Sequence, residues 1–598
     1  MAQFRTMILT DRGRNLLAKI VAGSSGVAFT KVGLSSQAYA DNAIPALTAL
    51  SNVKQTVQVS RVTKLNTAAV EIEAAIDNLN VTQGYTLASI GLYATDPDLG
   101  EILYGVSGSD VAGYVPAYNG VTVSGIYVNL TTSVNNASNV NLQVNPAATA
   151  TIADIQALQE EISDLQAFIG YTDDTIFGVE VDLANKTFTR LAGAVGKTPG
   201  TPFDSIRAFG GRRRCDLTND GVVVAYYGDP AYTETGKLTQ SVDLNPDDAE
   251  EADPNLQFAA GTIVQTMVEQ PRFYYKVVPL LLEKIADGDG YHMRKARYYV
   301  TDTPHAGFKL HPAFIQNGVE KDKIYLSAFE GSLWDASASA YILDDSQVAD
   351  FSNDMLCSIA NAKPISGLTQ TLTRANLRAL AQKRGAGWES QYCATVSATQ
   401  MLMLIEYAAL NMQSAIGRGA VDKTDDEATN MAEPTGATTL LGNASGTANN
   451  ANGIQFVTYR GEENMWGNIW KFVDGMNINA KGIHKLYVAD HDFADSVITG
   501  AYKDTGITLA KANGYISAFG YVEEFDWLMV TSETVGNSSL PVGDYFYQNN
   551  AYDGVMVALL GGRWSDGTLA GPWCWTVNIT PSYRSRHVGG RPVYIPQA

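Results

Sequence analysis

A single short heptad repeat divides this chain into two parts. Between residues 152 and 169 the apolar side chains recur at alternating spacings of three and four, with Gln, Glu and Asp between them. The core positions of the repeat are Ile155, Leu158, Ile162, Leu165 and Ile169. This spacing predicts a helix whose apolar seam joins copies of the chain in a short coiled coil. A lone amphipathic helix would show the same pattern.

On both sides of the repeat the sequence favours strands. Alternating stretches such as 53–62 and 121–144 are bounded by Gly, Asn and Pro, and the chain holds 30 Tyr and 54 Gly. Aromatic and branched residues suit pleated surfaces, and Gly and Asn suit turns. We therefore expect a mainly β fold with α+β parts. One exception is a capped amphipathic helix that begins after Thr10 and Asp11 and is stopped by Gly23.

Composition limits the classes of partner. The formal net charge is -20, which disfavours nucleic acid because phosphate binding needs clustered Lys and Arg. No uninterrupted run of about 18 apolar residues occurs, so we expect no membrane insertion and synthesis in the cytosol without a signal peptide. The four Cys and six His are scattered and lack ligand spacing. We expect reduced cysteines, no metal and no cofactor.

The N-terminal part resembles a known domain. The segments ILTDRGRNLLAKIVAG (8–23), FTKVGLSS (29–36) and IGLYATDPDLGEILYGV (90–106) are similar to the phage tail-collar or fibre-attachment domain. The resemblance covers roughly the first 145 residues. It implies a β-rich unit that docks a fibre onto the baseplate or another tail protein.

The C-terminal part resembles C-type lectin-like folds, which are shared with formylglycine-generating enzymes. The segment RGEENMWGNIWKFVDG (460–475) carries the resemblance, and GFKLHPAF (307–314) and KIYLSAFEGS (323–332) look like earlier parts of the same fold. We expect an attachment domain at 1–147, a coiled coil at 148–171, a β-rich intermediate part at 172–300 and a lectin-like domain at 301–598.

The last fifty or so residues, about 541–598, resemble the variable region of proteins that are diversified by retroelements, among them phage tropism determinants. Gly-rich turns and buried anchors would hold the backbone while the side chains between them face outward. The frame residues that match the family are Gly561, Gly562, Trp564, Gly567, Ala570, Gly571, Gly589, Gly590 and Arg591. The candidate receptor-binding residues are Tyr545, Tyr547, Asn549, Asn550, Tyr552, Arg563, Ser565, Asp566, Thr568, Trp573, Trp575, Asn578, Thr580, Tyr583, Ser585, Arg586 and His587.

Two details of this picture stay open. Trp573 and Trp575 belong either to the variable set or to the scaffold, because mutation at adenines does not readily turn an Asn codon into Trp. In the heptad, Ile at the first core position and Leu at the fourth favour two strands. Fibres of the family are usually trimers, and we expect a homotrimer because the flanking domains would set the number of copies.

These resemblances predict a non-enzymatic adhesin of the virion, a tail fibre that binds a bacterial surface receptor, either protein or glycan. A depolymerase is the first alternative and would need two carboxylates flanking a sugar bond. A copper enzyme of the formylglycine-generating type would need a pair of thiolates, and the terminal region offers Cys574 alone. A fibre with a structural role and no specific ligand is the third alternative.

Overall fold

The computed structural model describes residues 3–22, 27–64, 69–118, 125–133, 152–246, 253–482 and 484–597. The chain divides into two compact units, Met1–Glu161 and Ile162–Ala598. Strands are far more extensive than helices, which confirms the expected mainly β structure. No helix in the described part of the chain is both long enough and apolar enough to cross a membrane.

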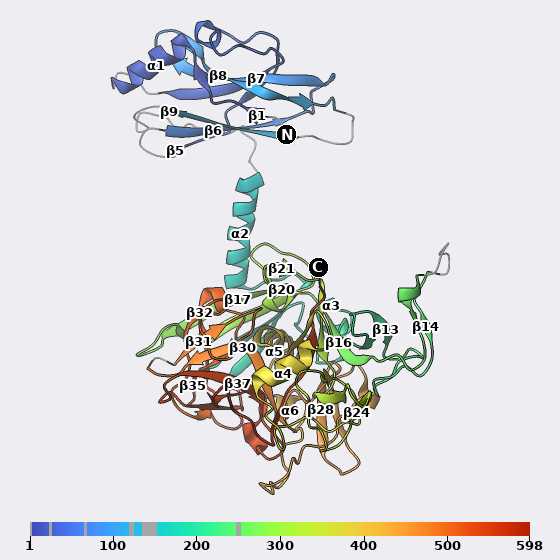
Figure 1. Cartoon of the computed structure of the whole chain (residues 1–598). Coiled ribbons are helices and arrows are strands. Elements are labelled where there is room, and N and C mark those ends of the chain that lie inside the picture. Colours follow the sequence, from blue (N-terminus) through green and yellow to red (C-terminus); the bar gives the residue numbers. More distant parts are fainter. Residues whose placement is uncertain are drawn as a thin grey trace. The chain divides into compact units, whose positions relative to one another are not determined.

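The N-terminal unit consists of two antiparallel sheets that share one core (Figure 1). The larger sheet has the strand order β1-β8-β7-β3-β4, with β2 beside β8, and the smaller has the order β5-β6-β9. Along β6 buried and partly exposed side chains alternate, as expected of a strand with one face on a core. The strands are β1 (Gln3–Phe4), β2 (Ile8–Leu9), β3 (Ala28–Ser35), β4 (Val53–Gln58), β5 (Arg61–Lys64), β6 (Ala69–Asp77), β7 (Tyr85–Asp96), β8 (Gly100–Val115) and β9 (Gly125–Ser133).

Helix α1 (Asp11–Val21) confirms the predicted capped helix. The side chain of Thr10 accepts a hydrogen bond of 3.0 Å from the backbone N–H of Gly13, which satisfies one of the free donors of the first turn. Leu16 and Ile20 are buried in the core of the unit. The predicted stop at Gly23 lies outside the described residues.

Helix α2 (Ile152–Ile169) occupies the heptad segment. Its seam residues are exposed in the single chain: Leu158 by 56%, Ile162 by 52%, Leu165 by 56% and Ile169 by 76%. The side chain of Ile155 lies outside the described residues. Ser163 is buried instead, and its hydroxyl lies 2.7 Å from that of Tyr171. The apolar seam is therefore not covered by the described part of its own chain.

Three main sheets form the C-terminal unit, with smaller ribbons around them. The first has the order β11-β10-β18-β17-β19, joined by β34 and β35; the second has β13-β12-β16-β22-β40-β26; and the third has β32-β31-β30-β37-β38-β36-β33, with β39 beside β30. Helix α5 (Cys393–Tyr407) lies among these strands (Figure 1). Nearly all its side chains are buried.

The strands of the main sheets have the following bounds: β10 (Ile176–Asp182), β11 (Thr187–Ala192), β12 (Arg213–Leu217), β13 (Val223–Tyr226), β16 (Gln265–Pro271), β17 (Tyr274–Lys284), β18 (Tyr291–Thr301), β19 (Lys309–Leu310), β22 (Lys323–Ser327), β26 (Trp388–Ser390), β30 (Trp470–Asn479), β31 (Lys485–Val488), β32 (Lys503–Thr508), β33 (Gly514–Tyr515), β34 (Ala518–Tyr521), β35 (Thr531–Glu533), β36 (Tyr545–Gln548), β37 (Val555–Gly561), β38 (Gly571–Ile579), β39 (Val588–Gly589) and β40 (Pro592–Tyr594). The ribbons are β14 (Val242–Asp243), β15 (Gln257–Phe258), β20 (Ile315–Gln316), β21 (Val319–Glu320), β23 (Ser332–Asp335), β24 (Ala340–Ile342), β25 (Met355–Cys357), β27 (Gly446–Asn449), β28 (Gln455–Tyr459) and β29 (Glu462–Glu463). The other helices are α3 (Arg207–Gly210), α4 (Arg374–Gln382) and α6 (Met412–Ala415).

The predicted boundary between 172–300 and 301–598 falls within one compact unit. Strand β18 spans that boundary and pairs with β10 from the first part and with β34 from the second. The two parts therefore fold as one unit. Pairing between strands more than 200 residues apart leaves no local signal in the sequence.

Candidate functional site

A cavity of about 210 Å³ opens on the C-terminal unit. Its lining consists of Trp470, Tyr547, Leu559, Arg563, Asp566, Thr576, Asn578, Ile579, Tyr583 and His587. Six of these residues are predicted receptor-binding candidates: Tyr547, Arg563, Asp566, Asn578, Tyr583 and His587. The fold therefore brings six of the seventeen candidates to one concave place.

The floor of the cavity comes from neighbouring strands of the third sheet. Leu559 on β37 lies opposite Thr576 on β38, and Thr576 lies opposite Tyr547 on β36. These three side chains form a row across the sheet. Trp470 on β30 extends the floor and contacts the ring of Tyr547 edge to face, with 6.2 Å between the ring centroids. Trp470 is 6% exposed, so only a small part of its indole faces the cavity.

One wall of the cavity is held by His587. The guanidinium of Arg563 donates to Nδ1 of His587 over 2.8 Å, and the Tyr583 hydroxyl lies 3.2 Å from Nε2. Because a guanidinium can act only as a donor, Nδ1 must carry a lone pair and Nε2 the proton. Burial, with the charges of Arg563 and Arg586, lowers the pKa of His587 to about 4. The imidazole is therefore neutral at neutral pH.

Behind this wall a loop outside the variable region supplies counter-charges. Asp425 forms ion pairs with Arg586 and with Arg563, the second at 3.2 Å. It also accepts a hydrogen bond of 3.4 Å from Nε1 of the buried Trp564. Both guanidinium groups lie against the Trp564 ring, at 5.8 Å for Arg563 and 5.3 Å for Arg586. This cluster fixes the backbone on which the wall is built.

The predicted frame residues lie where a frame requires them. All are buried except Gly567, which is partly exposed. Gly561 has φ of +98°, which side chains rarely adopt. A Cβ on Gly571 would lie 2.0 Å from the buried carboxylate of Asp544. Glycine is thus required at these two positions for different reasons, one conformational and one steric.

Trp573 and Trp575 belong to the scaffold, so their place among the receptor-binding candidates is corrected. They are 0% and 3% exposed and lie in the main core. Nε1 of Trp573 points at the sulfur of Met529, 3.2 Å away. Both indoles are on β38, whose alternate side chains face the interior in this stretch, and burying such large rings stabilises the unit.

Arg586 also differs from the free side chain that the sequence suggested. It is 11% exposed and bound to Asp425 and Asp426. Its role in the structure is to hold the wall. The remaining candidates are partly or fully exposed: Tyr545, Asn549, Asn550, Tyr552, Ser565, Thr568, Thr580 and Ser585.

Sequence reasoning missed four lining residues and the loop behind them. Trp470, Leu559, Thr576 and Ile579 line the cavity and were not among the predicted site residues. Asp425 lies 161 residues before Arg586. The excess of Arg over acidic residues in the variable region was the available signal that such a partner must lie elsewhere in the chain.

Comparison with known proteins finds a family match in one part of the chain. A family model described as phage tail-collar fibre protein, N-terminal, matches residues 1–153. The N-terminal segment is therefore similar to phage tail-collar fibre domains. A search of curated protein sequences found no match.

Among solved structures the chain is similar to the Major Tropism Determinant U1, P3c and I1 variants. Sequence identities are 11%, 10% and 12% in that order. Each comparison has a TM-score of 0.22 and covers 64% of this chain and 71% of the other.

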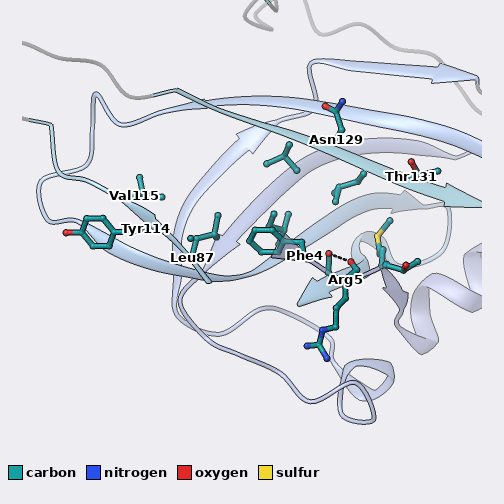
Figure 2. Close-up of a pocket in the computed structure, with 14 residues that line it drawn as sticks. Phe4, Arg5, Leu87, Tyr114, Val115, Asn129 and Thr131 are labelled. Carbon is teal, nitrogen blue, oxygen red and sulfur yellow. Dashed lines mark hydrogen bonds between the residues drawn. The ribbon is translucent and has the colours of Figure 1, made fainter. Parts of the chain in front are cut away.

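The N-terminal unit has a larger cavity of its own, about 640 Å³ (Figure 2). Phe4 and Leu87 line its apolar part, while Asn129 and Thr131 lie on β9 at its border. Tyr114 at the rim is 68% exposed. The Ser107 hydroxyl donates to the backbone carbonyl of Arg5 and joins β8 to the chain after β1.

Proposed function

We propose that this chain is a phage tail fibre that attaches to the tail by its N-terminal unit and binds a receptor on a bacterial surface by its C-terminal unit. The convergence of six variable-region candidates on one cavity carries the receptor-binding part. The match of residues 1–153 to the tail-collar fibre family supports the attachment part.

The chemistry of the candidate surface suits recognition. Partly exposed Tyr side chains bring contact area at little cost in conformational entropy, and Asn, Ser and Thr bring adaptable hydrogen bonds. The surface stands on a rigid base of buried glycines and indoles, so its side chains are held in place before a ligand arrives. Pre-organised surfaces of this kind lose less entropy on binding.

We further propose that the C-terminal unit is a C-type lectin-like domain and that retroelement mutagenesis changes its exposed positions. Asn549, Asn578 and Thr568 are exposed, whereas the frame around them is buried. Substitution at exposed sites usually changes stability little. The unit would therefore tolerate exchange at these positions and not at Gly561 or Gly571.

The exposed seam of α2 supports a homotrimer in which three copies of the helix pair. Leu158, Ile162 and Leu165 are each more than half exposed in the single chain. Exposing such a row in solution is unfavourable, and pairing with other copies would bury it. Lys276 pairs with Asp164 at 2.9 Å on another part of the helix, which leaves the seam free.

The cavity does not favour a depolymerase. Asp566 is the one carboxylate among its lining residues, and it accepts a hydrogen bond of 2.9 Å from the backbone N–H of Arg563. Glycosidases need two carboxylates on either side of the bond. Release of reducing ends from a bound polysaccharide would contradict the adhesin proposal.

Whole-cell binding tests the receptor role. We expect the full-length chain to bind cells of its host and the double variant Tyr545→Ala, Tyr547→Ala to lose that binding. Tyr291→Ala is the matched control, because Tyr291 is 41% exposed on a different sheet. If the double variant binds cells as well as the control, the receptor surface lies elsewhere.

Assembly of particles tests the attachment role. A chain that lacks residues 1–145 should bind cells but should not be incorporated into particles. Particles that carry the shortened chain in normal number would contradict the proposal.

A further inference from the structure

A row of four aromatic rings leads across the third sheet into the cavity. Tyr515 contacts Tyr545 with centroids 5.1 Å apart, Tyr545 contacts Tyr547 at 4.7 Å, and Tyr547 contacts Trp470 at 6.2 Å. The three tyrosines are partly exposed and Trp470 is at the floor. A ligand seated in the cavity can therefore continue along the row.

The row is tied to the wall of the cavity at its outer end. The hydroxyls of Tyr515 and Thr568 lie 3.0 Å apart, which links β33 to the short 3₁₀ turn Gly567–Leu569. Tyr515 lies before the variable region and was not predicted as a site residue. Because Tyr515 lies outside the variable region, the aromatic row does not consist of variable side chains alone.

The charged groups around the cavity are paired with one another. Arg563 pairs with Asp425 at 3.2 Å and with Asp566 at 3.4 Å. Arg586 is paired with Asp425 and Asp426. The imidazole of His587 is neutral, as its hydrogen bond from Arg563 requires. No unpaired charge remains to select an acidic or a basic ligand among the described lining residues.

Polar groups at the rim of the cavity can both donate and accept hydrogen bonds. Asn578 is exposed, and its amide makes no hydrogen bond to another described residue. An amide offers two donors and an acceptor side by side, which matches a pair of neighbouring hydroxyl groups. Tyr583 adds a hydroxyl to the lining of the cavity. Such groups can satisfy a ligand that carries hydroxyls and no charge.

The volume of the cavity limits the size of the ligand unit that can enter it. At about 210 Å³ the cavity is smaller than the roughly 300–1,000 Å³ of sites for drug-sized ligands. It accommodates one six-membered sugar ring rather than a folded protein loop. The C–H face of a sugar ring packs against an aromatic ring, and its hydroxyls seek donors and acceptors at the edge.

We propose that the cavity and the row Tyr515, Tyr545, Tyr547 bind a neutral bacterial surface polysaccharide, with one sugar ring in the cavity and the following units on the tyrosines. This inference rests on the proposed receptor-binding function and gives its ligand class. A protein receptor is the competing class, and the experiment below separates the two.

The first test applies the full-length chain to an array of purified bacterial surface polysaccharides, both neutral and acidic. We expect binding to one or more neutral polymers. Tyr547→Ala and Asn578→Ala should each weaken it at least tenfold, while Tyr291→Ala leaves it unchanged. Asn578 is exposed, so loss of binding in that variant is not a folding defect. Binding restricted to acidic polymers would overturn the proposal.

The second test uses cells that the full-length chain binds, treated either with periodate, which cleaves vicinal diols of sugars, or with proteinase K. We expect periodate to abolish binding and proteinase K to leave it intact. The reverse result would overturn the polysaccharide inference and leave the adhesin function standing. Failure to bind any cell or polymer would overturn the proposed function, and this inference with it.

Discussion

The guanidinium of Arg586 forms an ion pair with the carboxylate of Asp425, so the loop that holds Asp425 is tied to the variable region. Asp425 is 17% exposed and also contacts Arg563 and the indole N–H of Trp564. The Asp425 carboxylate thus binds two arginines and the frame residue Trp564. Some side chains of the wall stabilise the fold, and others are available to bind a ligand.

Arg586→Ala should destabilise the C-terminal unit. It would leave Asp425 with one cation fewer in a largely buried position, and losing a hydrogen bond to a charged group costs about 1–3 kcal/mol. Arg584→Ala is the matched control, because Arg584 is exposed and donates to Thr371 alone. Chemical denaturation of both variants measures the difference. Equal stability of the two variants would show that the Asp425 cluster contributes little.

Substitutions on β38 should distinguish buried scaffold residues from surface residues by their effect on the free energy of unfolding. Trp573→Ala removes a fully buried indole and should lower the free energy of unfolding by about 3–5 kcal/mol. Asn578→Ala on the same strand should change it by less than about 0.5 kcal/mol. Thermal and chemical unfolding give the comparison. A small effect of Trp573→Ala would contradict its assignment to the core.

Local patterns in the sequence were sufficient for much of the fold. The cap at Thr10 and the apolar spacing after it predicted α1, and the heptad spacing predicted α2. In both cases the signal lies within a few turns of helix, where neighbours in sequence are neighbours in space. The boundary predicted at residue 300 falls inside β18, which takes its partners from distant parts of the chain and so leaves no local signal.

The candidate site was predictable in its composition and not in its geometry. Tyr547, Asn578 and Tyr583 were singled out as recognition residues, and they line one cavity. Which side chains face inward depends on strand register, so Trp573 could not be separated from its neighbours by residue type. Asp425 and Tyr515 lie outside the variable region, and tertiary contacts alone bring them to the site.

Stability should fall in acid partly through His587. Its pKa is about 4 in the folded chain, against an ordinary value of 6.5. As the pH falls from 6.5 toward 4, the unfolded state binds a proton that the folded state does not bind. Folding is therefore progressively disfavoured, by up to about 3 kcal/mol once the pH is below both values.

The variant His587→Gln isolates this contribution. Gln keeps an acceptor for Arg563 but does not titrate, while the buried His311 and His484 remain in both proteins. The melting temperature of the wild-type chain should fall more steeply between pH 6.5 and 4 than that of the variant. Parallel curves would show that His587 is not held neutral by the fold.

The exposed seam of α2 predicts that copies of the chain associate through this helix. Ile162→Asp places a charge in the apolar seam, which is unfavourable when the seam is buried between helices and harmless when it is exposed. Gln159→Asp adds the same charge at an exposed position outside the seam. By light scattering, we expect the wild type and Gln159→Asp to have three times the mass of one chain and Ile162→Asp to approach 64.2 kDa. A wild-type mass of one chain, or an unchanged mass in Ile162→Asp, would show that the seam does not join the copies.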